Sequence, residues 1–332
     1  MSNYPLELLT ASRQSAFRAC QRLHYYSYTL GYRPVQVPSA LQLGTAIGNA
    51  LNVWWSNFSQ PEEEQLRLTL DSVQLSDVYA QQKATVMLEG YHAVWRSEVS
   101  EVLFIEKEFV TPLVNPDTGA RSRTFMLAGK MDKIVRLNDG RIAIVEHKTT
   151  SHSALPGSDY RRRLTLDGQI SQYYEGADAL VEKGELTEKP SIVLYDILVK
   201  PAVKPLEPSE KVRLKKDGTP YANVRMEKET PEAYRKRLYL KVLEEPGRYY
   251  QRAEIVRSSK ERDEYRFDVW HIGWQIREAR KSGYAPRNGD ACFRYGPCPF
   301  LPVCEGTASL ENTSLYRKSE NMHEELSSDT QE

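Results

Sequence analysis

The sequence has no excess of charge of either sign. Its 45 Lys and Arg residues balance 45 Asp and Glu residues, so the formal net charge at pH 7 is zero. A protein without a global positive field cannot attract nucleic acid through its net charge. Any binding of DNA must therefore depend on local clusters of basic residues.

Long apolar segments are also missing. The 332 residues contain no run of about 18 apolar residues, the length that a membrane-spanning helix needs. The first residues do not have the charged and then apolar layout of a secretory signal peptide. We therefore expect no membrane partner and a cytoplasmic location.

Cysteine is scarce, and the whole chain contains four residues of this type. They are Cys20, Cys292, Cys298 and Cys304. A reducing compartment disfavours disulfides, and four thiols are the number that fills one tetrahedral metal or cluster site. An iron–sulphur cluster, a structural zinc ion and unligated buried thiols are the three alternatives.

The pattern of apolar residues predicts an α/β fold in which helices flank a central mixed β-sheet. The expected helices are residues 11–31, 40–58, 73–97, 167–183, 230–243 and 261–282, and the expected strands are 102–110, 123–137, 141–149 and 191–199. The expected regions are an N-terminal helical region (1–100), a core (101–200), a basic projecting arm (201–230), C-terminal helices with the three-cysteine segment (231–305) and a disordered polar tail (306–332).

Two of the expected strands are joined by Asn-Asp-Gly, which suits a three-residue hairpin loop with Gly140 in the left-handed conformation. In that register Leu137 faces Arg141, and Asp132 falls directly opposite Glu146. Opposed residues share one face of a sheet. A shift of the loop by one residue would instead turn Asp132 to the other face.

Lys148 lies two residues beyond Glu146 and therefore on the same face, while His147 points the other way. Two neighbouring carboxylates repel unless a cation lies between them, and oxygen ligands suit Mg²⁺ or Mn²⁺. A lysine beside such an ion can orient a bound water or stabilise a developing charge. An ordinary surface ion pair is the alternative explanation of the same spacing.

On the next expected helix, Gln169 and Tyr173 are four residues apart and so share one face. Their amide and phenol groups could hold a water, Lys148 or a phosphate.

These motifs resemble the RecB-like, iron–sulphur branch of the PD-(D/E)XK nuclease superfamily. The segments that carry the resemblance are GKMD at 129–132, EHK at 146–148, QISQY at 169–173 and the one-plus-three layout of the cysteines. Members of this branch include AddB nucleases, CRISPR-adaptation nucleases and phage exonucleases. The resemblance spans nearly the whole chain.

The resemblance implies a restriction-endonuclease-like core in residues 101–200, with Asp132, Glu146 and the backbone carbonyl of His147 as ligands of Mg²⁺ or Mn²⁺. It further implies that Lys148 is catalytic and that Gln169 and Tyr173 support the site. The four cysteines would hold a 4Fe–4S cluster that joins the N-terminal and C-terminal segments.

The implied partner is DNA, as single strands or duplex ends, with a recombination or helicase protein as a possible further partner in a bacterial or phage-infected cell. Local basic clusters would contact its phosphates. The residues concerned are Arg161, Arg162, Arg163, Lys215 and Lys216.

The chain departs from this branch in two places. A histidine ligand usually follows an early helical glycine by four residues, but here Gly44 is followed by Gly48. The three C-terminal cysteines are also separated by five residues in each gap rather than by two and five. The sequence therefore predicts a metal-dependent DNA exonuclease, with a weakened or inactive DNA-binding module and an unrelated zinc-stapled protein as alternatives.

Overall fold

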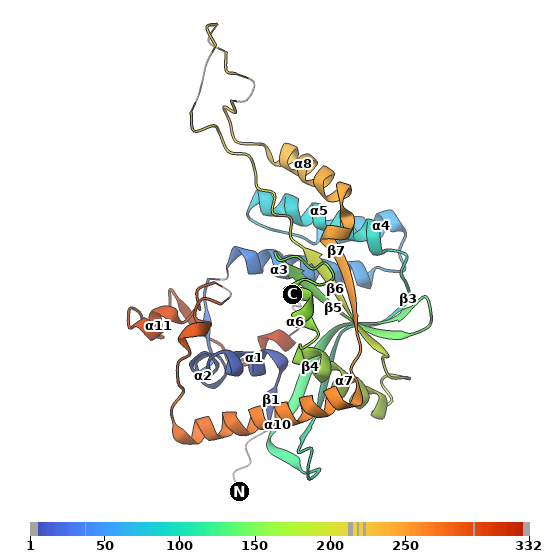
Figure 1. The fold of residues 1–332 in the computed structure, drawn as a ribbon, viewed down its shortest axis with the longest axis vertical. Helices are drawn as coiled ribbons and strands as arrows, with labels where there is room; N and C mark the ends of the chain where they lie inside the picture. Colours follow the sequence, from blue (N-terminus) through green and yellow to red (C-terminus); the bar gives the residue numbers. More distant parts are fainter. Residues whose placement is uncertain are drawn as a thin grey trace.

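The computed structural model describes residues 6–36, 38–211, 215–217, 219–221, 224–294 and 296–327. A mixed β-sheet lies at its centre, with helices packed around it (Figure 1). The strands of this sheet are β1 (Glu7–Leu9), β3 (Val99–Val114), β4 (Arg121–Leu137), β5 (Ile142–Thr150), β6 (Ile192–Val199) and β7 (Tyr250–Ile255). Their order is β1-β4-β5-β6-β7, and β3 also pairs with β4. The α/β prediction is confirmed.

Helices pack on both faces of the sheet and bury its apolar side chains. α3 (Ser39–Ser56) and α5 (Val78–Trp95) pack on one face, with α4 (Glu62–Asp71) against both of them. On the other face lie α7 (Gly168–Glu182), α1 (Ala11–Ala19) and α10 (Ser259–Ser282). Between its two neighbouring strands β6 is buried at every position, which explains its nearly continuous apolar sequence.

The long strand β4 changes its partner along one edge. Its residues 125–127 pair in parallel with β1, and its residues 133–136 pair antiparallel with β5. Its opposite edge pairs with β3. Within the described part of the chain, residues 128–132 have no strand partner on the edge that β1 and β5 share. The strands therefore separate at the segment that carries the GKMD motif.

A smaller lobe joins the two ends of the chain. It contains α2 (Gln21–His24), the π-helical turn η1 (Tyr25–Thr29), β2 (Tyr32–Pro34), η2 (Gly289–Ala291), α11 (Leu301–Glu305) and β8 (Tyr316–Lys318). β2 pairs antiparallel with β8. The buried residues of its own core are Tyr26, Phe300 and Tyr316, which is a small apolar core for a lobe of this size.

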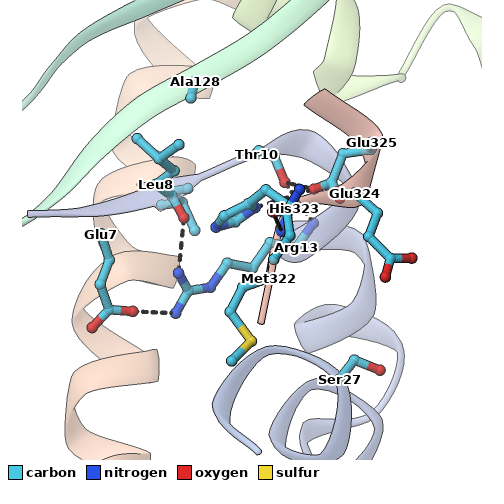
Figure 2. A network of polar contacts seen from close by, with 12 residues as sticks. Glu7, Leu8, Thr10, Arg13, Ser27, Ala128, Met322, His323, Glu324 and Glu325 are labelled. Atoms are coloured by element: carbon cyan, nitrogen blue, oxygen red, sulfur yellow. Dashed lines mark hydrogen bonds and ion pairs between the residues drawn. The ribbon is translucent and has the colours of Figure 1, made fainter. Parts of the chain in front are cut away.

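The structure corrects the prediction of a disordered tail from residue 306 onward. Tyr316 is buried in β8, and η3 (Glu324–Leu326) packs near β1 and α1 (Figure 2). Thr10 donates a hydrogen bond of 2.6 Å to Glu325, and Lys130 donates one of 3.1 Å to the carbonyl of Ser327. These contacts are made with residues far away in sequence, so tail composition alone does not reveal them. Residues 328–332 lie outside the described residues.

The described residues also form three further helices: α6 (Asp159–Leu164), α8 (Pro231–Glu244) and α9 (Pro246–Tyr249). The described residues of the segment between β6 and α8 extend away from the central sheet (Figure 1). Among the described helices, none combines the length and apolarity that crossing a membrane requires.

Candidate active site

The hairpin between β4 and β5 positions two of the site residues. Leu137 N–H donates to the carbonyl of Arg141, and Gly140 adopts a φ of 88°. This left-handed conformation favours glycine. Lys133 pairs with Val145, so the register agrees with the one derived from the sequence.

The pairing stops at Lys133, one residue before Asp132 would meet Glu146. Asp132 is therefore not on a regular rung of the sheet, which corrects one detail of the prediction. Its Oδ2 atom instead accepts a hydrogen bond of 2.8 Å from the backbone N–H of His147. The carboxylate thus takes the place of a main-chain acceptor where β4 and β5 separate, and it stays beside Glu146.

Lys148 lies on the Glu146 face, as predicted. Its Nζ atom is 2.5 Å from Glu146 Oε1 and donates a hydrogen bond of 3.0 Å to Gln169 Oε1. The Lys148 side chain is 28% exposed, whereas Glu146 is 3% exposed as a residue. Lys148 therefore reaches from a buried carboxylate toward solvent.

α7 completes this polar network because Gln169 and Tyr173 occupy successive turns of one helical face. Gln169 Nε2 donates to the Tyr173 hydroxyl at 2.7 Å. That hydroxyl lies 2.7 Å from Glu146 Oε2 and 3.0 Å from the carbonyl of Lys130. It has one proton and donates to one of these acceptors at a time. The sequence-derived residues thus form one connected cluster.

Burial and the neighbouring charge of Asp132 raise the pKa of Glu146 to about 7, although Lys148 and Tyr173 act in the opposite direction. Burial lowers the pKa of Lys148, but the charge of Glu146 and its hydrogen bond outweigh this effect and raise the pKa above its ordinary value. Lys148 is accordingly a cation in this arrangement. A buried carboxylate that a second carboxylate destabilises is a site that favours binding of a cation.

The donor set fits a small divalent ion. Two carboxylates, from Asp132 and Glu146, adjoin the backbone of His147, and such oxygen donors suit Mg²⁺ or Mn²⁺. No group of three His, Cys, Asp or Glu side chains within the described ranges is arranged to hold an ion. Backbone and water oxygens would therefore have to complete the coordination shell.

His147 points to the opposite face, as predicted, and meets a buried charge cluster that we did not predict. Its Nδ1 atom is 3.3 Å from Asp196 Oδ2, although neither ring nitrogen makes a well-directed hydrogen bond to a described residue. Tyr91 donates to the same oxygen at 2.5 Å, and Arg252 lies 3.3 Å from it. The signal was present in the sequence, because Asp196 interrupts an otherwise apolar strand.

These contacts fix the protonation states behind β5. Burial raises the pKa of the Asp196 carboxyl, but the charge of Arg252 and the contacts with His147 and Tyr91 outweigh this effect and hold it well below its usual range. Burial lowers the pKa of His147, and the charge of Lys133 lowers it further. Asp196 is therefore ionised and His147 is neutral at pH 7.

Gly48 lies on α3, at the place where the resembled branch has its histidine. A methyl group placed on Gly48 would have no described neighbour within 4 Å. One turn earlier, a methyl group on Gly44 would lie 2.9 Å from Thr149 Oγ1 and 3.8 Å from Lys200 Nζ. One turn later, Asn52 accepts a hydrogen bond of 2.6 Å from Lys133. Gly48 thus sits between two contacts of α3 with the sheet, beside open space.

All four cysteines line one cavity of about 430 Å³ in the smaller lobe. Cys20 Sγ accepts a hydrogen bond of 3.4 Å from the backbone N–H of Asn288. Burial raises the pKa of Cys298, and the nearby thiols Cys292, Cys20 and Cys304 act in the same direction. The structure therefore brings the residues from both ends of the chain together, while they form no compact ligand set within the described residues.

The predicted basic residues lie in different surroundings. Arg161 donates a hydrogen bond of 2.9 Å to the carbonyl of Arg252, which holds it against β7. Arg162 and Arg163 are exposed on the same helix, α6. Lys215 and Lys216 are exposed and lie in the segment between β6 and α8. Among these predicted residues, those of α6 lie nearest to the strand that carries Lys148, because Tyr160 of α6 contacts Thr150 of β5.

A model of the PD-(D/E)XK nuclease superfamily matches residues 8–305. No curated protein matches the chain. A solved structure from Eubacterium rectale, described only provisionally as an exonuclease, is similar at 12% identity with a TM-score of 0.46, over 92% of this chain and 90% of the other. Because the family model covers most of the sequence, including every residue of the cluster around Glu146, the chain belongs to the PD-(D/E)XK nuclease superfamily.

Proposed function

We propose that the protein is a metal-dependent deoxyribonuclease that hydrolyses phosphodiester bonds, acting as an exonuclease on DNA ends or single strands. The observation that carries this proposal is the cluster at the divergence of β4 and β5. There a buried carboxylate, a second carboxylate and an ammonium lie together on one face. This combination suits a reaction in which an anionic phosphate meets a cation and an activated water.

Asp132, Glu146 and the backbone carbonyl of His147 would hold Mg²⁺ or Mn²⁺. When bound, the ion supplies a water of lowered pKa and neutralises charge on the phosphate. Asp132 also holds the backbone N–H of His147, so its second oxygen remains available for a further contact. This bond fixes the local path of β5.

Lys148 would orient the attacking water or stabilise charge that develops on the phosphate. Its position depends on α7, because Gln169 accepts a hydrogen bond from Lys148 and donates one to Tyr173. Tyr173 in turn lies within hydrogen-bond distance of Glu146. The helix thereby fixes the distance between the ammonium and the carboxylate that would bind the ion.

The cysteine cavity would hold a 4Fe–4S cluster. Thiolate sulphurs are its usual ligands, and backbone N–H groups that bond to sulphur tune such clusters, as Asn288 could do at Cys20. The small apolar core of this lobe supports the same proposal, because a cluster would add links where hydrophobic burial is limited. Iron and sulphide analysis of anaerobically purified protein, with zinc determined in parallel, distinguishes the alternatives.

A second function is favoured by one observation, the glycine at position 48. Without a side-chain ligand from α3, the site could bind DNA and cleave it slowly or not at all. That protein would act as a DNA-binding module in recombination or repair.

Cleavage of labelled single-stranded and duplex DNA, with Mg²⁺, with Mn²⁺ and with chelator, tests the enzymatic proposal. We expect cleavage that requires the cation and that falls at least about 100-fold in Lys148→Ala, as loss of a general acid–base or electrostatic group does. Lys183→Ala is a matched control, because Lys183 follows the far end of α7 and bonds to the carbonyl of Val110. Equal cleavage by the wild type and Lys148→Ala would remove the assignment.

A further inference from the structure

A second cavity lies beyond the end of β5, the strand that carries Glu146 and Lys148. It measures about 440 Å³ and is lined by residues that follow the strand and by the first turns of α6. The lining residues are His152, Ser153, Ser158, Asp159, Tyr160 and Arg163. None of these was assigned a role in binding a base by the sequence motifs.

Thr150 connects this cavity to the active site. It lies on the same face of β5 as Glu146 and Lys148, because side chains alternate along a strand, and two residues span roughly 7 Å. Its hydroxyl accepts a hydrogen bond of 3.0 Å from the backbone N–H of His152 and makes another with the Tyr160 side chain. The Thr150 side chain therefore contacts both the backbone of His152 and the side chain of Tyr160 at the end of β5.

The rings of His152 and Tyr160 lie nearly parallel to each other. Their ring centroids are 6.3 Å apart and their planes are inclined by 22°. The Arg163 guanidinium lies 5.5 Å from the centre of the Tyr160 ring. Aromatic rings combined with an arginine are the usual platform on which proteins stack the bases of a single strand.

The loop that carries these rings is fixed to the protein core. Ala154 and Leu164 are both buried in the main hydrophobic cluster, and Tyr160 packs against that cluster. His152, in contrast, is exposed. The Tyr160 ring is thus held in place before any ligand arrives, which reduces the entropy lost on binding.

The cavity lining carries one carboxylate, from Asp159, and one guanidinium, from Arg163, so it offers no excess positive charge to a phosphate. Asp159 places a carboxylate in its lining, which would repel a phosphate close to it. The Lys148 ammonium is near enough to lower the pKa of Tyr160, although burial raises that pKa overall. A strand could therefore place one phosphate at Lys148 and turn a neutral base toward the two rings.

We propose that His152 and Tyr160 form a stacking site for an unpaired nucleobase next to the phosphate that is cleaved, so that the strand enters the active site single-stranded. This proposal rests on the proposed nuclease function and names the substrate of that same site. A base inside a duplex is covered on both faces and must leave the duplex before it can stack on protein, so frayed ends and single strands should be preferred.

Binding of single-stranded oligonucleotides, each with one abasic residue at a different position, tests the stacking site by fluorescence anisotropy in the presence of chelator. For the wild type we expect one or two positions at which loss of the base weakens binding roughly 5- to 150-fold, the range for one stacked base. The variant His152→Ala/Tyr160→Leu should bind the intact strand with the same loss. It should show no further loss at those abasic positions.

Tyr160→Phe keeps the ring and should bind within about twofold of the wild type. His152→Ala changes an exposed residue and serves if the double variant does not fold, with a partial loss expected. Tyr239→Ala removes an aromatic side chain that is 39% exposed on α8 and should change nothing.

A wild type without any sensitive abasic position, or an equal loss on intact and abasic strands, would overturn the stacking site. Cation-dependent cleavage could still occur in that case, so the nuclease assignment would survive. Conversely, base-dependent binding without cleavage would retain the stacking site and remove the enzymatic proposal.

Discussion

At the residue scale, Glu146 combines two opposed requirements. Its burial fixes the carboxylate between Lys148 and Tyr173, yet the same burial and Asp132 raise its pKa to about 7. Without a cation, Lys148 is the group that compensates its charge most directly. The arrangement therefore holds a carboxylate in position for an ion while an ammonium stabilises it.

At the same scale, Gly48 is the main departure from the family branch that the sequence resembles. Replacing Gly48 by His should place an imidazole in open space, because a Cβ atom there meets no described neighbour; in the family branch that the sequence resembles, this position carries the metal-binding histidine. We expect Gly48→His to reduce the Mn²⁺ concentration needed for half-maximal cleavage by about 10-fold or more, as an added ligand would.

Gly48→Ala is the control for this substitution. Both variants replace a helical glycine and should gain up to roughly 1 kcal/mol of stability, but only histidine can coordinate an ion. Identical Mn²⁺ titrations of cleavage for the two variants would show that position 48 does not reach the site.

At the element scale, the site depends on how β4 passes from one partner to another. The unpaired stretch of its edge is closed by side chains of α7: Gln172 donates to the carbonyl of Ala128 at 2.7 Å, and Tyr173 lies 3.0 Å from that of Lys130. Backbone groups that lose a strand partner are thus satisfied by the helix. A separation of strands, rather than an inserted loop, exposes Asp132.

The strands β5, β6 and β7 are joined behind the site by Asp196, and we expect Asp196→Asn to be strongly destabilising. The substitution leaves the buried Arg252 without its fully buried carboxylate partner, and breaking such a pair costs about 3–5 kcal/mol. Tyr91→Phe removes only the hydrogen bond to the same oxygen and should cost about 1–2 kcal/mol. Urea unfolding measures both values, and equal values would show that Asp196 does not hold this layer together.

Local patterns in the sequence predicted those parts of the site that lie close together in the chain. The hairpin at Gly140, the shared face of Glu146 and Lys148, and the pair Gln169 and Tyr173 were all recognisable from spacing. The pairing of β1 with β4 and of β2 with β8 was not, because it joins segments that are more than 100 residues apart and carry no local signature. The stop of the β4–β5 ladder at Lys133 was missed because only the competing side chain of Asp132 reveals it.

At the scale of the whole molecule, the N-terminal segment is tied to α10 and to the C-terminal segment by a polar network (Figure 2). Arg13 donates to the carbonyl of Leu8 at 2.8 Å and pairs with Glu7, which also pairs with Arg280. Arg13 Nε also donates to His24 at 3.2 Å. Residues from the first tenth of the chain and Arg280 from its last fifth therefore share one partly buried set of charges.

His24 should make the stability of this arrangement depend on pH. Burial, with the charges of Arg13 and Arg280, lowers the pKa of His24 from 6.5 to about 3. In the unfolded chain, His24 therefore binds a proton below pH 6.5. In the folded protein, His24 does not bind this proton until the pH falls to about 3. The contribution is fully present above pH 6.5 and is lost by about 1.4 kcal/mol per pH unit below it.

Urea unfolding at pH values from 8 to 5 measures this loss. His24→Gln retains an acceptor for Arg13 and cannot titrate, so its stability should fall less steeply than that of the wild type across this range. Parallel slopes for the two proteins would assign the acid sensitivity to other groups.

The pairing of β2 with β8 also has a consequence for biosynthesis. β2 leaves the ribosome about 280 residues before its partner strand has been made, which at 5–20 residues per second is a delay of roughly 15–60 s. During that time the other three cysteines that line the cavity of Cys20 have not yet been synthesised. Any metal centre in this lobe can therefore be assembled only at the end of translation or afterwards.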